Sequence, residues 1–239
     1  MTTVDELWPN GPKYIQRPGV FKLGSDSVLL AAFAKLSRVK NVCDLGSGGG
    51  VLPILLQAYK PGIEITGIEI DPAAVELSRE NVELNGMADK ISIIHGDMRE
   101  YKTHLEAGKY DLVVSNPPYF AAGSGYESDT LPTARGESEC SLEDVCRAAA
   151  YAVRWGGCFA IVHRPERLSE LFCTLTACGL EPKRLRMTQY KNGAAPNLVL
   201  IEARRGGKPG LVIEPPLIMT DESGGESEEI RRIYRRGEQ

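Results

Sequence analysis

At 239 residues, 42% of them hydrophobic, the chain has the size of one large α/β domain with a full core. Its formal net charge of −4 excludes a uniformly basic nucleic-acid-binding protein, although basic residues gather in 180–210. Six cysteines include no C-x-x-C pair and three scattered histidines lack metal-ligand spacing, so we expect reduced thiols and no metal.

The beginning of the chain lacks the apolar core of a signal peptide, and no apolar run reaches the length that spans a membrane. We therefore expect a cytoplasmic protein without membrane contact. Nothing in the sequence indicates an obligate protein partner.

Residues 1–19 hold three prolines and two glycines and are predicted to be irregular. Ser25 or Asp26 can then cap a helix that runs to about Ser37. From residue 41 onward, short apolar runs alternate with helical patterns. The predicted strands are 41–45, 63–70, 91–95, 110–115, 157–162, 180–187 and 198–203, and the predicted helices are 51–59, 72–84, 141–153 and 165–177, with a charged helix near the C-terminus.

This alternation predicts an α/β fold with a seven-stranded, mostly parallel sheet and helices on both faces. We expect one domain over residues 1–239. Its parts are an N-terminal lid for substrate and cofactor (1–38), a core (39–205) and a C-terminal extension (206–239).

The stretch after the strand at 110–115 reads Asn116-Pro117-Pro118-Tyr119, and its prolines end the strand because they have no N–H to donate. An exocyclic amine or an amide is a poor nucleophile. Two acceptors, the Asn116 side-chain oxygen and the Pro117 carbonyl, can orient such a nitrogen toward attack. Tyr119 offers a face on which a planar group can stack. A plain strand-ending turn is the alternative reading of these four residues.

A second motif, D-x-G-x-G-x-G from Asp44 to Gly50, follows the strand at 41–45. Its glycines allow a ligand to approach the backbone closely. Glu69, 23 residues after Gly46, can accept both hydroxyls of a ribose. Asp97 and Met98 follow the strand at 91–95 and can receive an adenine amino group and its ring.

Together, DLGSGGG, GIEID, HGDM and DLVVSNPPYF resemble the class I S-adenosylmethionine-dependent methyltransferases, in that family's order and spacing. The resemblance implies a Rossmann-like fold, S-adenosylmethionine as cofactor and S-adenosylhomocysteine as product. It implies that Asn116 to Tyr119 hold the amine to be methylated. The implied cofactor residues are Lys22, Gly24, Ser25, Asp26, Asp44, Gly46, Ser47, Gly48, Gly50, Glu69, Ile70, Asp97, Met98 and Asn116.

The segment 22–30, KLGSDSVLL, is similar to the K-x-G-T-D-x-x-L-L entry motif of bacterial methyltransferases that modify N6 of adenosine 37 in valine tRNA. Ser25 stands where that motif has threonine, and a hydroxyl is kept. The similarity extends over about residues 14–236 and implies a tRNA partner. Candidate phosphate contacts are Lys13, Arg17 and Arg135.

Other readings remain open at this point. Release-factor methyltransferases also carry NPPY and modify a glutamine amide, but they have a longer helical region before the glycine motif. Ribosomal RNA or DNA amines are further candidate substrates. A catalytically silent RNA-binding protein would have no need of the acidic, glycine and NPPY positions.

Overall fold

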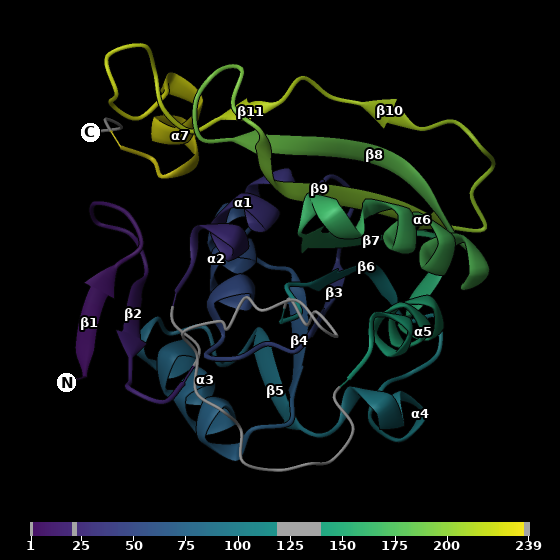
Figure 1. Cartoon of the computed structure of the whole chain (residues 1–239). Coiled ribbons are helices and arrows are strands. Elements are labelled where there is room, and N and C mark those ends of the chain that lie inside the picture. The colour runs from purple at the N-terminus through teal and green to yellow at the C-terminus, as the bar shows by residue number, and fades with distance from the viewer. Residues whose placement is uncertain (1, 21–22, 119–139, 237–239) are drawn as a thin grey trace.

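The computed structural model describes residues 2–20, 23–118 and 140–236. Figure 1 shows a central sheet with helices on both of its faces. Seven long strands run in the order β5-β4-β3-β6-β7-β9-β8, and β9 is antiparallel to both of its neighbours. These strands are β3 (Asn41–Leu45), β4 (Glu64–Glu69), β5 (Ile91–His95), β6 (Tyr110–Ser115), β7 (Val153–His163), β8 (Leu180–Gln189) and β9 (Pro196–Arg205).

The predicted seven-stranded, mostly parallel sheet is therefore confirmed. Two strands of two residues each, β10 (Val212–Ile213) and β11 (Leu217–Ile218), were not predicted and pair in parallel with β8. None of the helices in the described ranges is long and apolar enough to cross a bilayer.

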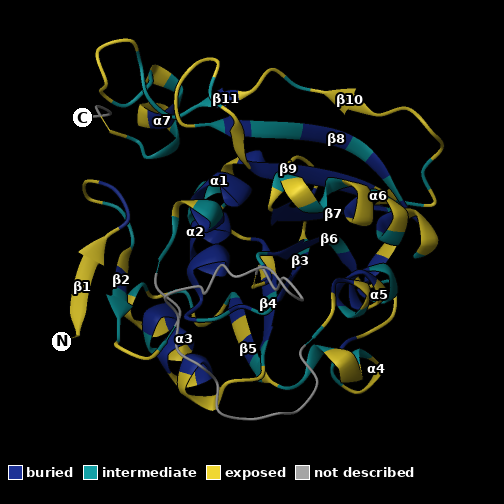
Figure 2. Cartoon of the chain, in the orientation of Figure 1, coloured by how far each residue is buried: buried dark blue, intermediate teal, exposed yellow. Residues whose placement is uncertain are grey.

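Hydrophobic residues of the long strands alternate between two cores, one on each face of the sheet. In β6, Leu112 and Val114 join one core and Val113 joins the other. Figure 2 shows the buried strands at the centre of the molecule. The first core is covered by α1 (Ser25–Phe33), α2 (Val51–Tyr59) and α3 (Pro72–Leu84), and the second by α4 (Tyr101–His104), α5 (Leu142–Ala152) and α6 (Leu168–Ala177). A last helix, α7 (Glu228–Ile233), lies near α1.

The N-terminal residues correct one prediction. Residues 1–19 are not irregular throughout, because β1 (Thr3–Glu6) and β2 (Lys13–Gln16) form an antiparallel hairpin. The prolines at 9 and 12 lie in the connection between the strands, where no ladder N–H is needed. Besides β1, the backbone of β2 bonds to the side chains of Asn81 and Asn85, which lie far away in the sequence.

Helix α1 also differs from its predicted bounds, since it ends at Phe33 and its N-cap is Gly24, without a side-chain cap. A buried cation holds its last turn against the sheet. Arg184 of β8 donates to the Phe33 carbonyl at 3.2 Å and to Glu202 at 2.8 Å, and its guanidinium lies 4.1 Å from the centre of the Phe33 ring. These contacts fix the last turn of α1 against β8.

The chain reverses its direction across the sheet between β3 and β6. From β3 it proceeds through β4 to β5 on one side, and from β6 to β7 on the other. Ligands of such sheets bind where the order reverses, at the carboxyl ends of the strands. The buried Ser115 hydroxyl donates to the Leu45 carbonyl at 2.8 Å and ties these two strand ends together. Gly46 and Asn116, the next residues of the two strands, therefore lie close together.

Candidate functional site

The loop after β3 is folded back onto β4. The N–H groups of Gly46 and Ser47 both donate to the Ile68 carbonyl, at 2.9 and 3.0 Å, and Gly50 donates to the Ser47 carbonyl at 2.9 Å. Gly46 and Gly48 adopt φ values of 76° and 52°, which L side chains rarely adopt. The tight turn predicted for this motif is therefore present.

The four glycines divide into two kinds. Among the described residues, a methyl group added at Gly48 would meet nothing within 4 Å, and one at Gly46 would meet only the Met98 methyl group at 3.2 Å. Added at Gly49 or Gly50, it would collide with the Tyr14 or Ser78 hydroxyl. Gly48 thus leaves space where a ligand can approach, and Gly46 has Met98 as its one close neighbour among the described residues, while Gly49 and Gly50 are required by packing.

Glu69, at the end of β4, has its carboxylate held by backbone donors. Its Oε2 accepts from Gly48 N at 2.8 Å, and its Oε1 accepts from Ile70 N at 2.8 Å and Asp71 N at 2.9 Å. The carboxylate is consequently fixed beside the open side of the glycine loop, with lone pairs left on Oε2 for a ligand hydroxyl.

Asp44 is the least satisfied polar residue of the site. Its side chain is fully buried, and in the described part of the chain neither carboxyl oxygen has a hydrogen-bond partner. Burial, and the charge of Glu69 in second place, raise the pKa of the Asp44 carboxyl well above its ordinary value. A buried carboxyl group beside a loop open to ligand fits a cationic group that would pair with it.

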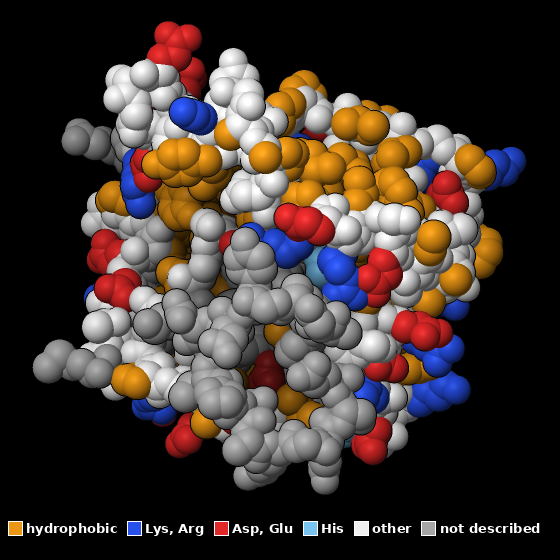
Figure 3. All heavy atoms as spheres, viewed as in Figure 1, with side chains coloured by type: hydrophobic (Ala, Val, Ile, Leu, Met, Phe, Trp, Pro, Cys, Tyr) orange, Lys and Arg blue, Asp and Glu red, His pale blue; other side chains and the backbone are white. Residues whose placement is uncertain are grey.

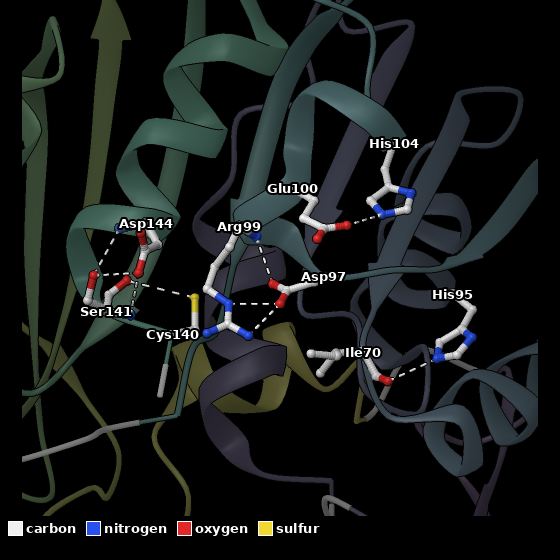
Figure 4. A network of polar contacts seen from close by, with 9 residues as sticks. All are labelled: Ile70, His95, Asp97, Arg99, Glu100, His104, Cys140, Ser141 and Asp144. Atoms are coloured by element: carbon white, nitrogen blue, oxygen red, sulfur yellow. Dashed lines mark hydrogen bonds and ion pairs between the residues drawn. The ribbon is translucent and has the colours of Figure 1, made fainter. Parts of the chain in front are cut away.

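Asp97 lies after β5 and is oriented by its neighbour Arg99, as Figure 4 shows. The Arg99 backbone N–H donates to Oδ1 at 2.8 Å, and its side chain donates to Oδ2 at 2.6 and 2.8 Å. The side-chain bond from Arg99 lowers the pKa of Asp97, which therefore remains an acceptor at neutral pH. Ile70, 56% exposed, offers an apolar side chain on the neighbouring strand end.

Cys140 lies on the other side of Arg99, directly before Ser141, which caps α5 (Figure 4). Burial raises the pKa of the Cys140 thiol to about 11. It is therefore a protonated thiol at neutral pH, which argues against its being a nucleophile.

Asn116 follows β6 and is held by helix α1. Its Nδ2 donates to the Ser27 hydroxyl at 3.0 Å, so Oδ1 is the end of the amide that lies away from Ser27. Pro117 is buried and Pro118 is exposed. Asn116 and Pro117 directly follow Ser115, whose hydroxyl bonds to the residue before Gly46, whereas Tyr119 lies outside the described residues.

His163, at the end of β7, is the nearest imidazole by strand order. Burial lowers its pKa to about 4, and its Nδ1 accepts from Arg164 N at 2.8 Å. It is therefore neutral at pH 7 and a weak base.

The other predicted residues are less closely gathered. Gly24 caps α1, the exposed Ser25 contacts Asp26, and the exposed Lys13 lies on β2. Arg17 forms an ion pair with Glu80 at 2.6 Å, with both side chains 36% exposed. Lys22 and Arg135 lie outside the described residues.

Sequence reasoning missed three residues that shape this site: Ser27, which holds Asn116, and Tyr14 and Asn81, which contact the glycine loop. Ser27 could have been found from its position in the first turn of the predicted helix, two residues after Ser25, because that turn faces the edge of the sheet. No local pattern distinguished Tyr14 or Asn81.

Comparison with known proteins agrees with this geometry. Residues 13–165 match the model of the methyltransferase small domain family. A protein of Tolumonas auensis named tRNA1(Val) (adenine(37)-N6)-methyltransferase is 31% identical over 84% of this chain and 82% of its own length. A protein of the same name from Yersinia pseudotuberculosis is 32% identical over 64% of this chain and 61% of its own length.

Solved structures show the same fold at lower identity. A predicted O-methyltransferase from Agrobacterium tumefaciens superposes with a TM-score of 0.71 and 21% identity, over 88% of this chain and 95% of its own. A geranyl diphosphate methyltransferase in complex with S-adenosylmethionine gives a TM-score of 0.54 and 15% identity, over 74% and 85% of the two chains.

Proposed function

The chain belongs to the methyltransferase small domain family, and on that premise we propose that it transfers a methyl group from S-adenosylmethionine to N6 of adenine 37 in a valine tRNA. The relatives that match over most of the chain carry this activity in their names. The observation that supports the proposal is the Ser115–Leu45 hydrogen bond, which joins the two strand ends that lead into the NPP segment and the glycine loop.

The residues present fit S-adenosylmethionine. Gly46 and Gly48 would lie against the cofactor, Asp44 would pair with its ammonium group and Glu69 would accept from its ribose hydroxyls. Asp97 and Ile70 would bind the adenine. When bound, the cofactor supplies an electrophilic methyl group on a sulfonium centre.

Asn116 and Pro117 would orient the target nitrogen. The Asn116 Oδ1 and the Pro117 carbonyl would each accept one N–H of the adenine amino group, which holds its lone pair toward the methyl group. The cationic nitrogen formed by transfer loses its proton readily, so a strong base is not needed. The neutral, weakly basic His163 and the protonated Cys140 are consistent with this chemistry.

Substrate contacts would come from the rim of the same edge. Tyr190 begins the β8–β9 turn and is 67% exposed, and β8 ends at the same edge as β6 and β7. Figure 3 shows an apolar area over β8 and charged side chains of both signs around it. On a rim of mixed charge, base stacking on an aromatic ring would add to phosphate contacts from Lys13 and Arg17.

Tritiated S-adenosylmethionine tests this proposal, with total tRNA as one substrate and a fraction of ribosomal proteins and release factors as the other. The expected result is label in tRNA that digests to N6-methyladenosine. Label in protein would replace the proposal with glutamine methylation at the same site residues.

An enzyme of tRNA maturation would work in the cytoplasm.

A further inference from the structure

Asn81 of α3 and Asn85, the residue that caps the C-terminus of α3, hold the N-terminal hairpin. Asn85 Oδ1 accepts from Lys13 N at 2.8 Å, and its Nδ2 donates to the Lys13 carbonyl at 2.7 Å. One helical turn earlier, Asn81 makes the same pair of bonds to Ile15, at 2.7 and 3.2 Å.

The spacing of these residues explains the arrangement. Side chains at i and i+4 of a helix are about 6 Å apart, and alternate residues of a strand are separated by about 7 Å. The two amides therefore take the place of a third strand along β2, whose other edge pairs with β1.

Asn81 makes one contact that Asn85 does not. Its Nδ2 also donates to the Gly49 carbonyl at 3.0 Å, and the side chain is fully buried. Tyr14, between Lys13 and Ile15, fills the space beside the Gly49 Cα with its hydroxyl group. The hairpin, α3 and the glycine loop therefore meet at Gly49.

Ordering a loop of four glycines and one serine has a large entropic cost, because glycine loses more conformational entropy than any other residue. The neighbouring Gly48 must keep its N–H on Glu69 and its open face toward the ligand. The hydrogen bond from Asn81 to the carbonyl of the next residue, Gly49, restricts the backbone on which both features of Gly48 depend. A binding loop that is already ordered loses less conformational entropy when the ligand binds.

We propose that Asn81 is a positioning residue for the cofactor loop, which it holds in the ligand-ready form through the Gly49 carbonyl. It thereby couples the docking of the N-terminal hairpin to cofactor affinity. This inference rests on the proposed use of S-adenosylmethionine and goes beyond it by naming a residue that does not touch the ligand.

Asn81→Ala and Asn85→Ala serve as test and control, because both remove two bonds to the hairpin and only the first removes the bond to Gly49. Asn85→Ala also removes the bond from Asn85 Nδ2 to the Asn81 carbonyl, which lies within the C-terminal turn of α3. Isothermal titration with S-adenosylmethionine should give about a tenfold higher Kd for Asn81→Ala, the equivalent of one hydrogen bond. Asn85→Ala should stay within about twofold of wild type. The KM for the cofactor should rise in parallel, with kcat at saturating cofactor nearly unchanged.

Thermal melts of both variants test whether they are folded. If Asn81→Ala does not fold, Asn81→Asp keeps the acceptor for Ile15 N and replaces the donor to Gly49 by an acceptor. Its Kd should then rise at least as much. The inference would be overturned if Asn81→Ala and Asn85→Ala had equal Kd values for S-adenosylmethionine, or if Asn81→Ala lowered kcat alone. A wild-type protein that binds no S-adenosylmethionine would instead overturn the proposed function.

Discussion

Asp44 combines full burial with a carboxyl group that has no hydrogen-bond partner in the described chain. Its raised pKa means that the folded chain holds this proton more tightly than the unfolded chain, whose aspartates titrate near pH 4. Asp44 therefore contributes stability below about pH 4, and this contribution is lost as the pH rises through the raised pKa. A cationic ligand beside Asp44 would stabilise the ionised carboxylate and offset this loss of stability at neutral pH.

Asp44→Asn should accordingly stabilise the cofactor-free protein at pH 8, because an amide neither has to bury a charge nor has to retain a proton that the unfolded chain releases. A gain of about 1 kcal/mol corresponds to a Tm increase of about 2–4 °C for a chain of this size. The same variant should lose cofactor affinity by at least tenfold. Melting curves at pH 5 and pH 8 test the first effect, and a variant less stable than wild type at both would contradict it.

Asn116 carries the nitrogen chemistry of the account. Asn116→Ala removes one of two acceptors for the target amine, so kcat should fall by about 100-fold or more, as when one preorganised polar group is removed elsewhere. The Kd for S-adenosylmethionine should change by less than about threefold. Ser27→Ala, which removes one acceptor of the Asn116 amide and keeps the amide itself, should give a smaller loss of kcat. Normal turnover in Asn116→Ala would exclude the proposed role.

Among the elements, the strands and helices of the core were predictable because each has its own period of hydrophobic residues. The runs 41–45 and 110–115 coincide with β3 and β6, and Asp71-Pro72 begins α3 as its capping pattern indicates. The caps and turns needed no information from distant residues.

The N-terminal hairpin could not be predicted in the same way. Its second strand is stabilised by Asn81 and Asn85, which lie on a helix more than sixty residues away. The prolines and glycines of 1–19 indicated loops. The side chains of Asn81 and Asn85, which stabilise the hairpin, could not be assigned to it from the local sequence. The position of the motifs at the strand ends was predictable, whereas the residues that brace these motifs, Ser27 and Tyr14, depend on tertiary contacts.

The contact between β2 and the glycine loop makes a prediction at this scale. Gly49→Ala should weaken cofactor binding, because its methyl group would collide with the Tyr14 hydroxyl. The backbone at Gly49 has no positive φ, so an alanine is otherwise tolerated. Tyr14→Phe removes the colliding oxygen and leaves the ring carbon at 3.3 Å.

The double variant Gly49→Ala with Tyr14→Phe should therefore regain most of the lost affinity. A double-mutant cycle on the Kd for S-adenosylmethionine measures the coupling directly. Additive effects of the two changes would mean that the hairpin does not set the space around the loop.

For the whole molecule, the functional edge of the sheet gathers segments that are far apart in the chain. The C-terminal extension takes part, because Thr220 donates to the Tyr190 carbonyl through its N–H at 2.9 Å and through its hydroxyl at 2.8 Å. This pins the backbone of an exposed aromatic residue at the rim. A rigid aromatic side chain binds a planar partner at little cost in entropy.

Tyr190→Ala should raise the KM for tRNA by about tenfold, since stacking of one base on an aromatic ring contributes about 1–3 kcal/mol. The Kd for S-adenosylmethionine should not change, because Tyr190 lies outside the cofactor loop. Tyr190→Phe, which keeps the ring, should behave like wild type. Equal KM values for the alanine variant and the wild type would remove Tyr190 from the substrate surface.

The most direct test of the central claim uses two transcripts of a valine tRNA, one natural and one with adenosine 37 replaced by guanosine. Each is incubated with the enzyme and S-adenosylmethionine, and methylated nucleosides are measured by mass spectrometry after digestion. The account predicts one N6-methyladenosine per natural tRNA and none in the substituted transcript. Equal methylation of both, or of neither while a protein glutamine is modified, would contradict it.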